Sequence, residues 1–153
     1  MAIYYADSSA LVKRHLPEAG SPWFTALATP AAGNMIVTTR ISLVESYSAL
    51  NRRVRKAAIT LPDYQRVIVD LNHTCSSKYQ IVELTLEVID DARLLLECHP
   101  LRAYDAVQLS SALQARRTIS ATGASDPVFL SSDDCLFVAA RAEGFITDNP
   151  NHH

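Results

Sequence analysis

Short continuous apolar runs alternate along the chain with longer segments of helical periodicity. Such runs, bounded by turn-forming residues, are typical of strands that are covered on both faces of a sheet. The pattern predicts strands at 3–6, 35–39, 79–84 and 128–130, with an edge strand beginning at 145. It predicts helices at 9–15, 22–27, 42–58, 61–72, 85–98, 101–117 and 135–143. This alternation indicates an α/β protein with three layers, α/β/α, around a mostly parallel sheet of four or five strands.

The segment 101–117 is apolar on nearly every side of its predicted helix, which indicates a central position. Asp105 shares a stripe of that helix with Leu101 and Leu109, so we expect it to face the interior. An ionised carboxylate in such surroundings is costly unless it is paired or bound to a metal ion. An intrahelical pair with Arg102, one turn earlier, is the alternative explanation.

Two other acids follow predicted strands directly. Asp7 ends the first strand and Asp133 comes just after the fourth. Ligands of open α/β sheets bind beyond the carboxyl ends of the strands, so both acids should project from the same edge. Alone, each would serve as a helix N-cap, and Glu45 would be a first-turn glutamate favoured by the helix dipole.

Taken together, the four acids indicate one shared pocket. Clustered carboxylates raise one another's pKa unless cations neutralise them, so a pocket of this composition implies a divalent metal ion. Ligand sets made only of oxygen favour Mg²⁺ or Mn²⁺ over zinc.

The formal net charge of −2 argues against a simple nucleic-acid-binding protein, yet the basic residues are unevenly distributed. Four of them lie within positions 52–56, and Arg52 and Lys56 share a predicted helix face with Glu45. Such a run is most often a solvated helix face. The alternative is a track for phosphates, in which Arg52 and Lys56 contact an RNA backbone.

Length and composition favour one domain with its own core, because almost half of the 153 residues are apolar. We assign 1–149 to this domain and 150–153 to a tail, whose His152-His153 pair is typical of a purification-tag remnant. The three cysteines fit neither a disulfide framework nor a zinc site, and no apolar run reaches membrane-spanning length. We therefore expect a cytoplasmic protein without membrane association.

Three other chemistries fit the sequence poorly. A metal-free ribonuclease needs paired histidines, and His15, His73 and His99 share no motif. A phosphoacceptor signalling domain needs a lysine at a late strand end, which is absent. A haloacid-type phosphatase needs a second aspartate two residues after Asp7, where Ser9 stands.

The segments around the four acids resemble the PIN-domain ribonucleases, and among them the VapC toxins of bacterial type II toxin–antitoxin pairs. The resemblance spans nearly the whole chain in the right order. It rests on the segments Asp7-Ser8-Ser9-Ala10-Leu11, Leu43-Val44-Glu45-Ser46, Leu101-Arg102-Ala103-Tyr104-Asp105-Ala106-Val107-Gln108-Leu109 and Ser131-Ser132-Asp133. The third segment is specific, whereas the first alone is weak. The fold implied is PIN-like.

The resemblance implies a metal-dependent endoribonuclease that hydrolyses RNA phosphodiester bonds. Its catalytic and metal-binding residues would be Asp7, Glu45, Asp105 and Asp133, holding Mg²⁺ or, in its place, Mn²⁺. Asp134 is a second candidate for the fourth position, and Ser9 and Ser131 would orient ligands or water. The implied partners are a second copy of the chain in a homodimer and a cognate antitoxin that blocks the acidic groove. The alternative is a catalytically silent PIN-like module that binds RNA or protein, although all four acids are present.

Overall fold

The structure, a computed structural model, describes residues 1–153 and is built around a five-stranded sheet. The strand order is β3-β2-β1-β4-β5, and every neighbouring pair is parallel. The strands are β1 (Ile3–Ala6), β2 (Met35–Thr39), β3 (Gln80–Val82), β4 (Val128–Leu130) and β5 (Thr147–Asp148). All four predicted strands are present. The edge strand begins at Thr147 rather than at residue 145.

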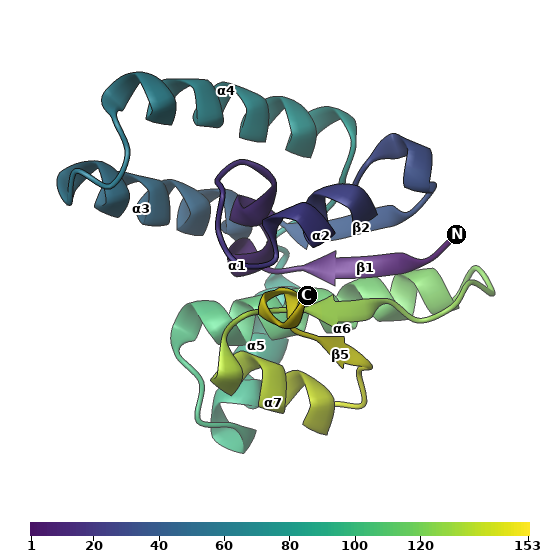
Figure 1. Ribbon diagram of the computed structural model, residues 1–153. Coiled ribbons are helices and arrows are strands. Elements are labelled where there is room, and N and C mark those ends of the chain that lie inside the picture. The colour runs from purple at the N-terminus through teal and green to yellow at the C-terminus, as the bar shows by residue number, and fades with distance from the viewer.

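Helices cover both faces of this sheet (Figure 1). On one face lie α1 (Ser8–Leu11), α2 (Ser21–Leu27), α3 (Ile41–Arg55) and α4 (Leu61–Ser77), and on the other lie α5 (Leu86–Cys98), α6 (Ala103–Ser120) and α7 (Asp134–Ala142). Three short 3-10 turns complete the chain: η1 (Val12–Arg14), η2 (Pro30–Ala32) and η3 (Pro150–His152). The predicted three-layer α/β/α class is confirmed.

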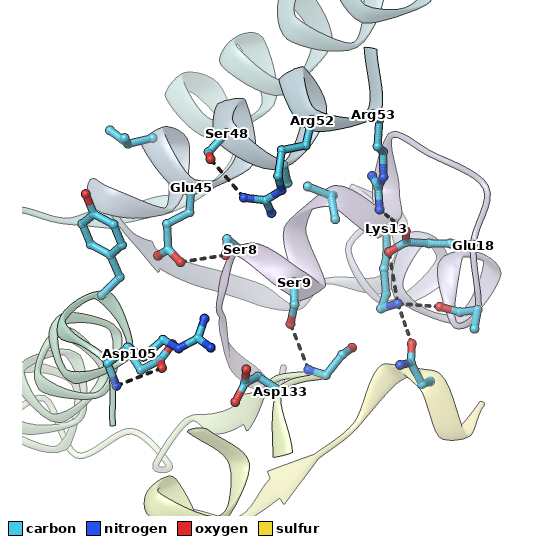
Figure 2. Close-up of a pocket in the computed structure, with 18 residues that line it drawn as sticks. Ser8, Ser9, Lys13, Glu18, Glu45, Ser48, Arg52, Arg53, Asp105 and Asp133 are labelled. Carbon is cyan, nitrogen blue, oxygen red and sulfur yellow. Dashed lines mark hydrogen bonds and ion pairs between the residues drawn. The ribbon is translucent and has the colours of Figure 1, made fainter. Parts of the chain in front are cut away.

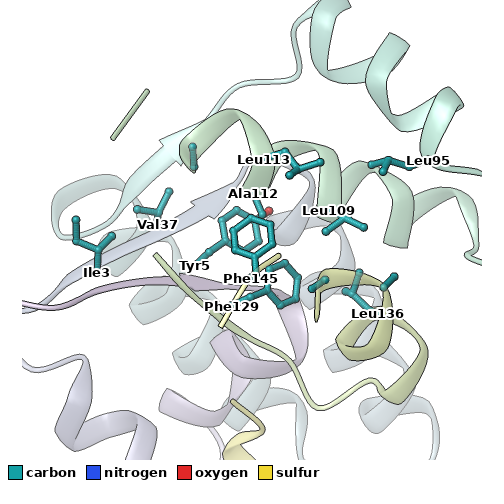
Figure 3. Packing of buried hydrophobic residues seen from close by; sticks show 13 residues of the cluster. Ile3, Tyr5, Val37, Leu95, Leu109, Ala112, Leu113, Phe129, Leu136 and Phe145 are labelled. Carbon is teal, nitrogen blue, oxygen red and sulfur yellow. The ribbon is translucent and has the colours of Figure 1, made fainter. Parts of the chain in front are cut away.

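Alternation along β1 divides the core into two clusters. Ile3 and Tyr5 point to the face covered by α5, α6 and α7, whereas Ala6 joins the cluster under α1 to α4. Figure 3 shows Tyr5, Phe129 and Phe145 at the centre of the first cluster, where the rings of Tyr5 and Phe129 stack with centroids 5.3 Å apart. The sheet is therefore buried on both faces, which explains the continuous apolar runs of its strands.

The predicted central helix is α6. It contacts α5, β2, α3 and α7, and its buried side chains span more than one face. It begins at Ala103, two residues later than expected, because the preceding Arg102 takes the extended backbone conformation of an N-cap.

Three other helices differ from the prediction in length. The helix predicted at 42–58 is α3, which ends three residues early, at Arg55. The segment 9–15 divides into the four-residue α1 and the turn η1. In contrast, α4 continues five residues beyond 72, because Thr74 and Cys75 extend its buried stripe. Asn72, the last residue of the predicted helix, and His73 are both exposed.

Residues 150–153 pack against the domain rather than extending from it as a tail. Pro150 is buried, and the Lys13 ammonium donates a hydrogen bond to Oδ1 of Asn151 over 2.6 Å. The ring of His153 stacks on Trp23 with centroids 4.1 Å apart. No helix of the protein combines the length and the apolar character needed to cross a membrane.

Candidate functional site

A pocket of about 780 Å³ opens where β1 and β4 end. Its lining includes Ser8 and Ser9 after β1, Ser132 and Asp133 after β4, and side chains of α3 and the first turn of α6. Figure 2 shows Glu45, Asp105 and Asp133 around this space. The pocket therefore lies at the sheet edge where parallel α/β proteins bind ligands.

Asp7 does not line the pocket: it is only 3% exposed and directly precedes the lining residues Ser8 and Ser9. As the N-cap of α1, its Oδ1 accepts hydrogen bonds from the Ala10 amide at 3.0 Å and the Ser9 hydroxyl at 2.6 Å. Its Oδ2 accepts from the Ser131 hydroxyl, also at 2.6 Å. Burial raises the pKa of Asp7 to about 6, although these three donors favour the ionised form.

Ser9 and Ser131 also connect the ends of β1 and β4. The backbone amide of Ser132 donates to the Ser9 hydroxyl at 2.9 Å, and the amide of Asp133 donates to the Ser131 hydroxyl at 3.0 Å. Each hydroxyl therefore accepts a hydrogen bond from a backbone amide that follows β4 and donates one to the Asp7 carboxylate. This arrangement fixes the orientation of the Asp7 carboxylate.

Glu45 projects from α3 and is held at both oxygens. The Gln108 amide donates to Oε1 at 2.7 Å, and the Ser8 hydroxyl donates to Oε2 at 3.3 Å. Partial burial raises the pKa of Glu45, and the negative charges of Asp7 and Asp105 raise it further.

Asp105 is only partly buried, which corrects the expectation that it faces the interior. Leu109 is buried, but Asp105, one turn earlier on the same side of α6, lines the pocket rather than the core. Its Oδ2 accepts a hydrogen bond from the Arg102 amide at 3.3 Å, and no ion pair joins the two side chains. Partial burial raises the pKa of Asp105, and nearby Asp133 adds to the shift.

Asp133 is exposed on the pocket wall and accepts from the Leu136 amide at 2.9 Å as the N-cap of α7. Its neighbour Asp134 is the first residue of α7 and does not line the pocket. This placement favours Asp133 over Asp134 as the fourth acid of the site.

The four carboxylates influence one another across the pocket. The charge of Asp133 raises the pKa of Asp7 and of Asp105. The charges of Asp7 and Asp105 both raise the pKa of Glu45. No three acidic, histidine or cysteine side chains are gathered into a ready ligand group for a metal ion. Each carboxylate accepts instead from donors of the protein. The donor set, made only of oxygens on separate elements, has the chemistry that hard divalent cations select.

The basic wall of the pocket divides into paired and unpaired cations. Lys13 is buried and pairs with Glu18 at 3.2 Å, and Glu18 also pairs with Arg53 at 2.6 Å. Arg52 lies on the same side of α3 as Glu45 and has only a 3.2 Å hydrogen bond to the Ser48 hydroxyl. Arg52 is therefore free to bind an anion at the pocket.

Lys56 and Arg102 are placed differently from the sequence expectation. Lys56 follows the last residue of α3 and does not line the pocket. Arg102 lines the pocket, is exposed and forms no ion pair, although the sequence interpretation gave it no binding role. Its place one turn before Asp105 in the specific motif was the available signal.

Gln108 is the second residue that the sequence interpretation missed. It is 1% exposed, and its amide nitrogen donates to Glu45 at 2.7 Å and to the Ser42 hydroxyl at 2.8 Å. Its amide oxygen accepts from the buried Tyr5 hydroxyl at 2.9 Å. Because all three partners are present, the amide has one orientation, with its donors toward Glu45. The signal was a glutamine set between the apolar residues Val107 and Leu109, one turn after Asp105.

Several solved structures that share this fold are described as proteins of toxin–antitoxin systems. A chain of a toxin–antitoxin complex from Klebsiella pneumoniae is 16% identical, with 96% of this chain and 97% of that chain covered and a TM-score of 0.60. VapC20 of Mycobacterium tuberculosis, described as a toxin that cleaves the sarcin–ricin loop, is 17% identical over 94% and 96%, with a TM-score of 0.62. A chain of VapBC2 from Rickettsia felis, bound to a promoter DNA fragment, is 15% identical over 96% and 98%, with a TM-score of 0.60.

These likenesses extend over almost the full length of each chain, and they show the fold. The chain has the three-layer α/β/α fold of the PIN type. Among the solved structures, it is the fold of the VapC toxins. No protein-family model matches the sequence, and no curated protein matches it.

Proposed function

We propose that this protein is a metal-dependent endoribonuclease, the toxin of a bacterial toxin–antitoxin pair, which acts as a homodimer and is inhibited by a cognate antitoxin. One observation carries the catalytic part of the proposal. Glu45, Asp105 and Asp133 line one pocket, and the buried Asp7 directly precedes Ser8 and Ser9 of its wall. None of the four carboxylates forms an ion pair with a lysine, arginine or histidine. Only Arg102, which forms no ion pair with Asp105 but lowers its pKa, partly offsets their negative charge. The fold of the VapC toxins supports the same activity and the toxin assignment.

The residues have separate tasks in this proposal. Asp7, Glu45, Asp105 and Asp133 would hold Mg²⁺, or Mn²⁺ in its place. Such an ion, when bound, supplies an activated water at neutral pH and stabilises the leaving oxygen of the phosphodiester. Ser9 and Ser131 keep the carboxylate of Asp7 in one orientation. The free guanidinium of Arg52 binds the RNA backbone beside the cleaved bond.

Incubation of the purified protein with total RNA, followed by sequencing of the new ends, tests the proposal. We expect cleavage with Mg²⁺ or Mn²⁺ that leaves 5′-phosphate ends and is lost in excess chelator and in an Asp7→Asn control. Cleavage that persists in chelator, or ends with 2′,3′-cyclic phosphate, would contradict a metal-dependent mechanism. RNA that binds but is never cut would favour the silent PIN-like module.

The double variant Arg52→Ala with Lys56→Ala should bind RNA more weakly and with a flatter dependence on salt. Each lost phosphate contact lowers the slope of log K against log salt by about one. Since only Arg52 lines the pocket, the single variant Arg52→Ala should account for most of the loss. Binding titrations at several salt concentrations measure both slopes. Arg93→Ala, an exposed arginine on α5, is the matched control, and an equal effect there would make the α3 cations ordinary surface charge.

Gln108→Leu should reduce RNA cleavage by about 10- to 100-fold, the range found when a partner that orients a metal ligand is removed. Leucine has a similar size but cannot donate to Glu45, and it leaves the buried Tyr5 hydroxyl without its acceptor. We therefore also expect a loss of about 1–3 kcal/mol in the free energy of unfolding. Cleavage rates and chemical denaturation measure the two effects. Gln114→Leu, on the same helix but outside the pocket, is the control and should be active. Equal cleavage rates for the two variants would show that Gln108 does not support the site.

A further inference from the structure

Tyr104 differs from every other aromatic residue of the chain. The protein has one tryptophan, six tyrosines and four phenylalanines, and Tyr104 is the only one of them that is exposed. Its relative exposure is 56%, and its hydroxyl has no hydrogen-bond partner among the residues of the protein. This one exposed ring lines the acidic pocket.

The charges around Tyr104 indicate what it contacts. It directly precedes Asp105 and comes two residues after Arg102, and all three line the pocket. On the α3 side, Arg52 and Glu45 lie along the same helix, and Figure 2 shows them above Asp105 and Asp133. The exposed ring thus lies among carboxylates and two guanidinium groups that form no ion pairs.

We propose that Tyr104 is a stacking subsite for one unpaired nucleobase of the RNA substrate, with Arg102 on the adjoining phosphate. The inference rests on the proposed ribonuclease activity and adds to it the feature by which the site selects single-stranded RNA. A flat apolar ring beside free guanidinium groups matches the two components of a nucleotide, a base with a π-face and an anionic phosphate. Bases can stack on such a ring only where the strand is unpaired, as in loops and ends.

Fluorescence of 2-aminopurine tests this subsite directly. Short single-stranded oligoribonucleotides carry the probe at successive positions and are bound in an Asp105→Asn background, in which the RNA should remain uncut. At one position we expect quenching on binding, kept in Tyr104→Phe and lost in Tyr104→Ala. Alanine should also weaken binding by about tenfold or more, the usual scale for one stacked base. An abasic site at that position should weaken binding equally, and its effect should not add to that of Tyr104→Ala.

Matched variants separate the outcomes. Val138→Ala removes a 65% exposed apolar side chain of α7 outside the pocket and should leave binding unchanged. Arg102→Ala should lower the salt slope by about one without changing the quenching. RNA binding that is equally strong in Tyr104→Ala would overturn the base subsite, and would favour a protein contact at this ring. Failure of the unmodified protein to bind and cut RNA would overturn the proposed function, and the subsite with it.

Discussion

Asp105→Asn should lower RNA cleavage by at least about a hundredfold while the fold remains intact. The variant removes one negative charge from the four that would hold the divalent ion, and loss of a ligand should cost more than the 10- to 100-fold of a supporting residue. Asparagine keeps an oxygen that can accept from the Arg102 amide, so the first turn of α6 should be preserved. Initial rates with saturating Mg²⁺, together with circular dichroism, measure the two parts of this prediction.

Asp126→Asn provides the matched control for Asp105→Asn. Asp126 is an exposed aspartate that accepts a hydrogen bond from the Ser120 hydroxyl at 2.6 Å, far from the pocket. This variant removes the same charge and keeps the same acceptor, so cleavage should be unchanged. If Asp105→Asn were also fully active, the carboxylate of Asp105 would be only a cap of α6 and the site would have three acids.

The layers and the sheet could be predicted from the sequence because they depend on local patterns. An apolar run such as Ile3–Ala6 is long enough for a strand and too short for a helix, and its burial on both faces follows from continuity alone. The approximate position of Asp7 at the sheet edge follows from the same rule, since the carboxyl ends of parallel strands meet there.

Features of the site that depend on tertiary contacts could not be predicted in the same way. Tyr5 and Glu45 meet Gln108 across 103 and 63 residues of sequence, so no local pattern records their contact. The exposure of Asp105 depends on what covers the first turn of α6, which periodicity does not describe. Helical spacing does place Lys56 one turn after Arg52, and its amide donates to the Arg52 carbonyl, but spacing does not show where the pocket ends along α3.

Asp7→Asn should make the metal-free protein more stable at neutral pH although it removes cleavage. The pKa of Asp7 is raised from 3.8 to about 6 by burial. Between these two pH values the folded protein holds a proton that the unfolded chain has lost. The free energy of unfolding therefore falls as the pH rises through this window, and above it the full cost of ionising Asp7 is present.

The gain in Asp7→Asn at pH 7.5 should reach at most about 3 kcal/mol, from 1.36 kcal/mol for each pKa unit. Part of this gain in stability is offset because the Ser131 hydroxyl loses the carboxylate oxygen that accepts its hydrogen bond. Denaturation in chelator at pH 4 and pH 7.5 measures the difference, which should shrink toward the lower pH. Asp133→Asn, at an exposed N-cap, should change stability by no more than about 0.5 kcal/mol at either pH.

Added Mg²⁺ should stabilise the unmodified protein more than it stabilises the Asp7→Asn variant, since an ion that binds only the folded state raises its stability. A variant that is less stable at pH 7.5 than the unmodified protein would mean that the three hydrogen bonds to Asp7 outweigh the cost of burying its charge.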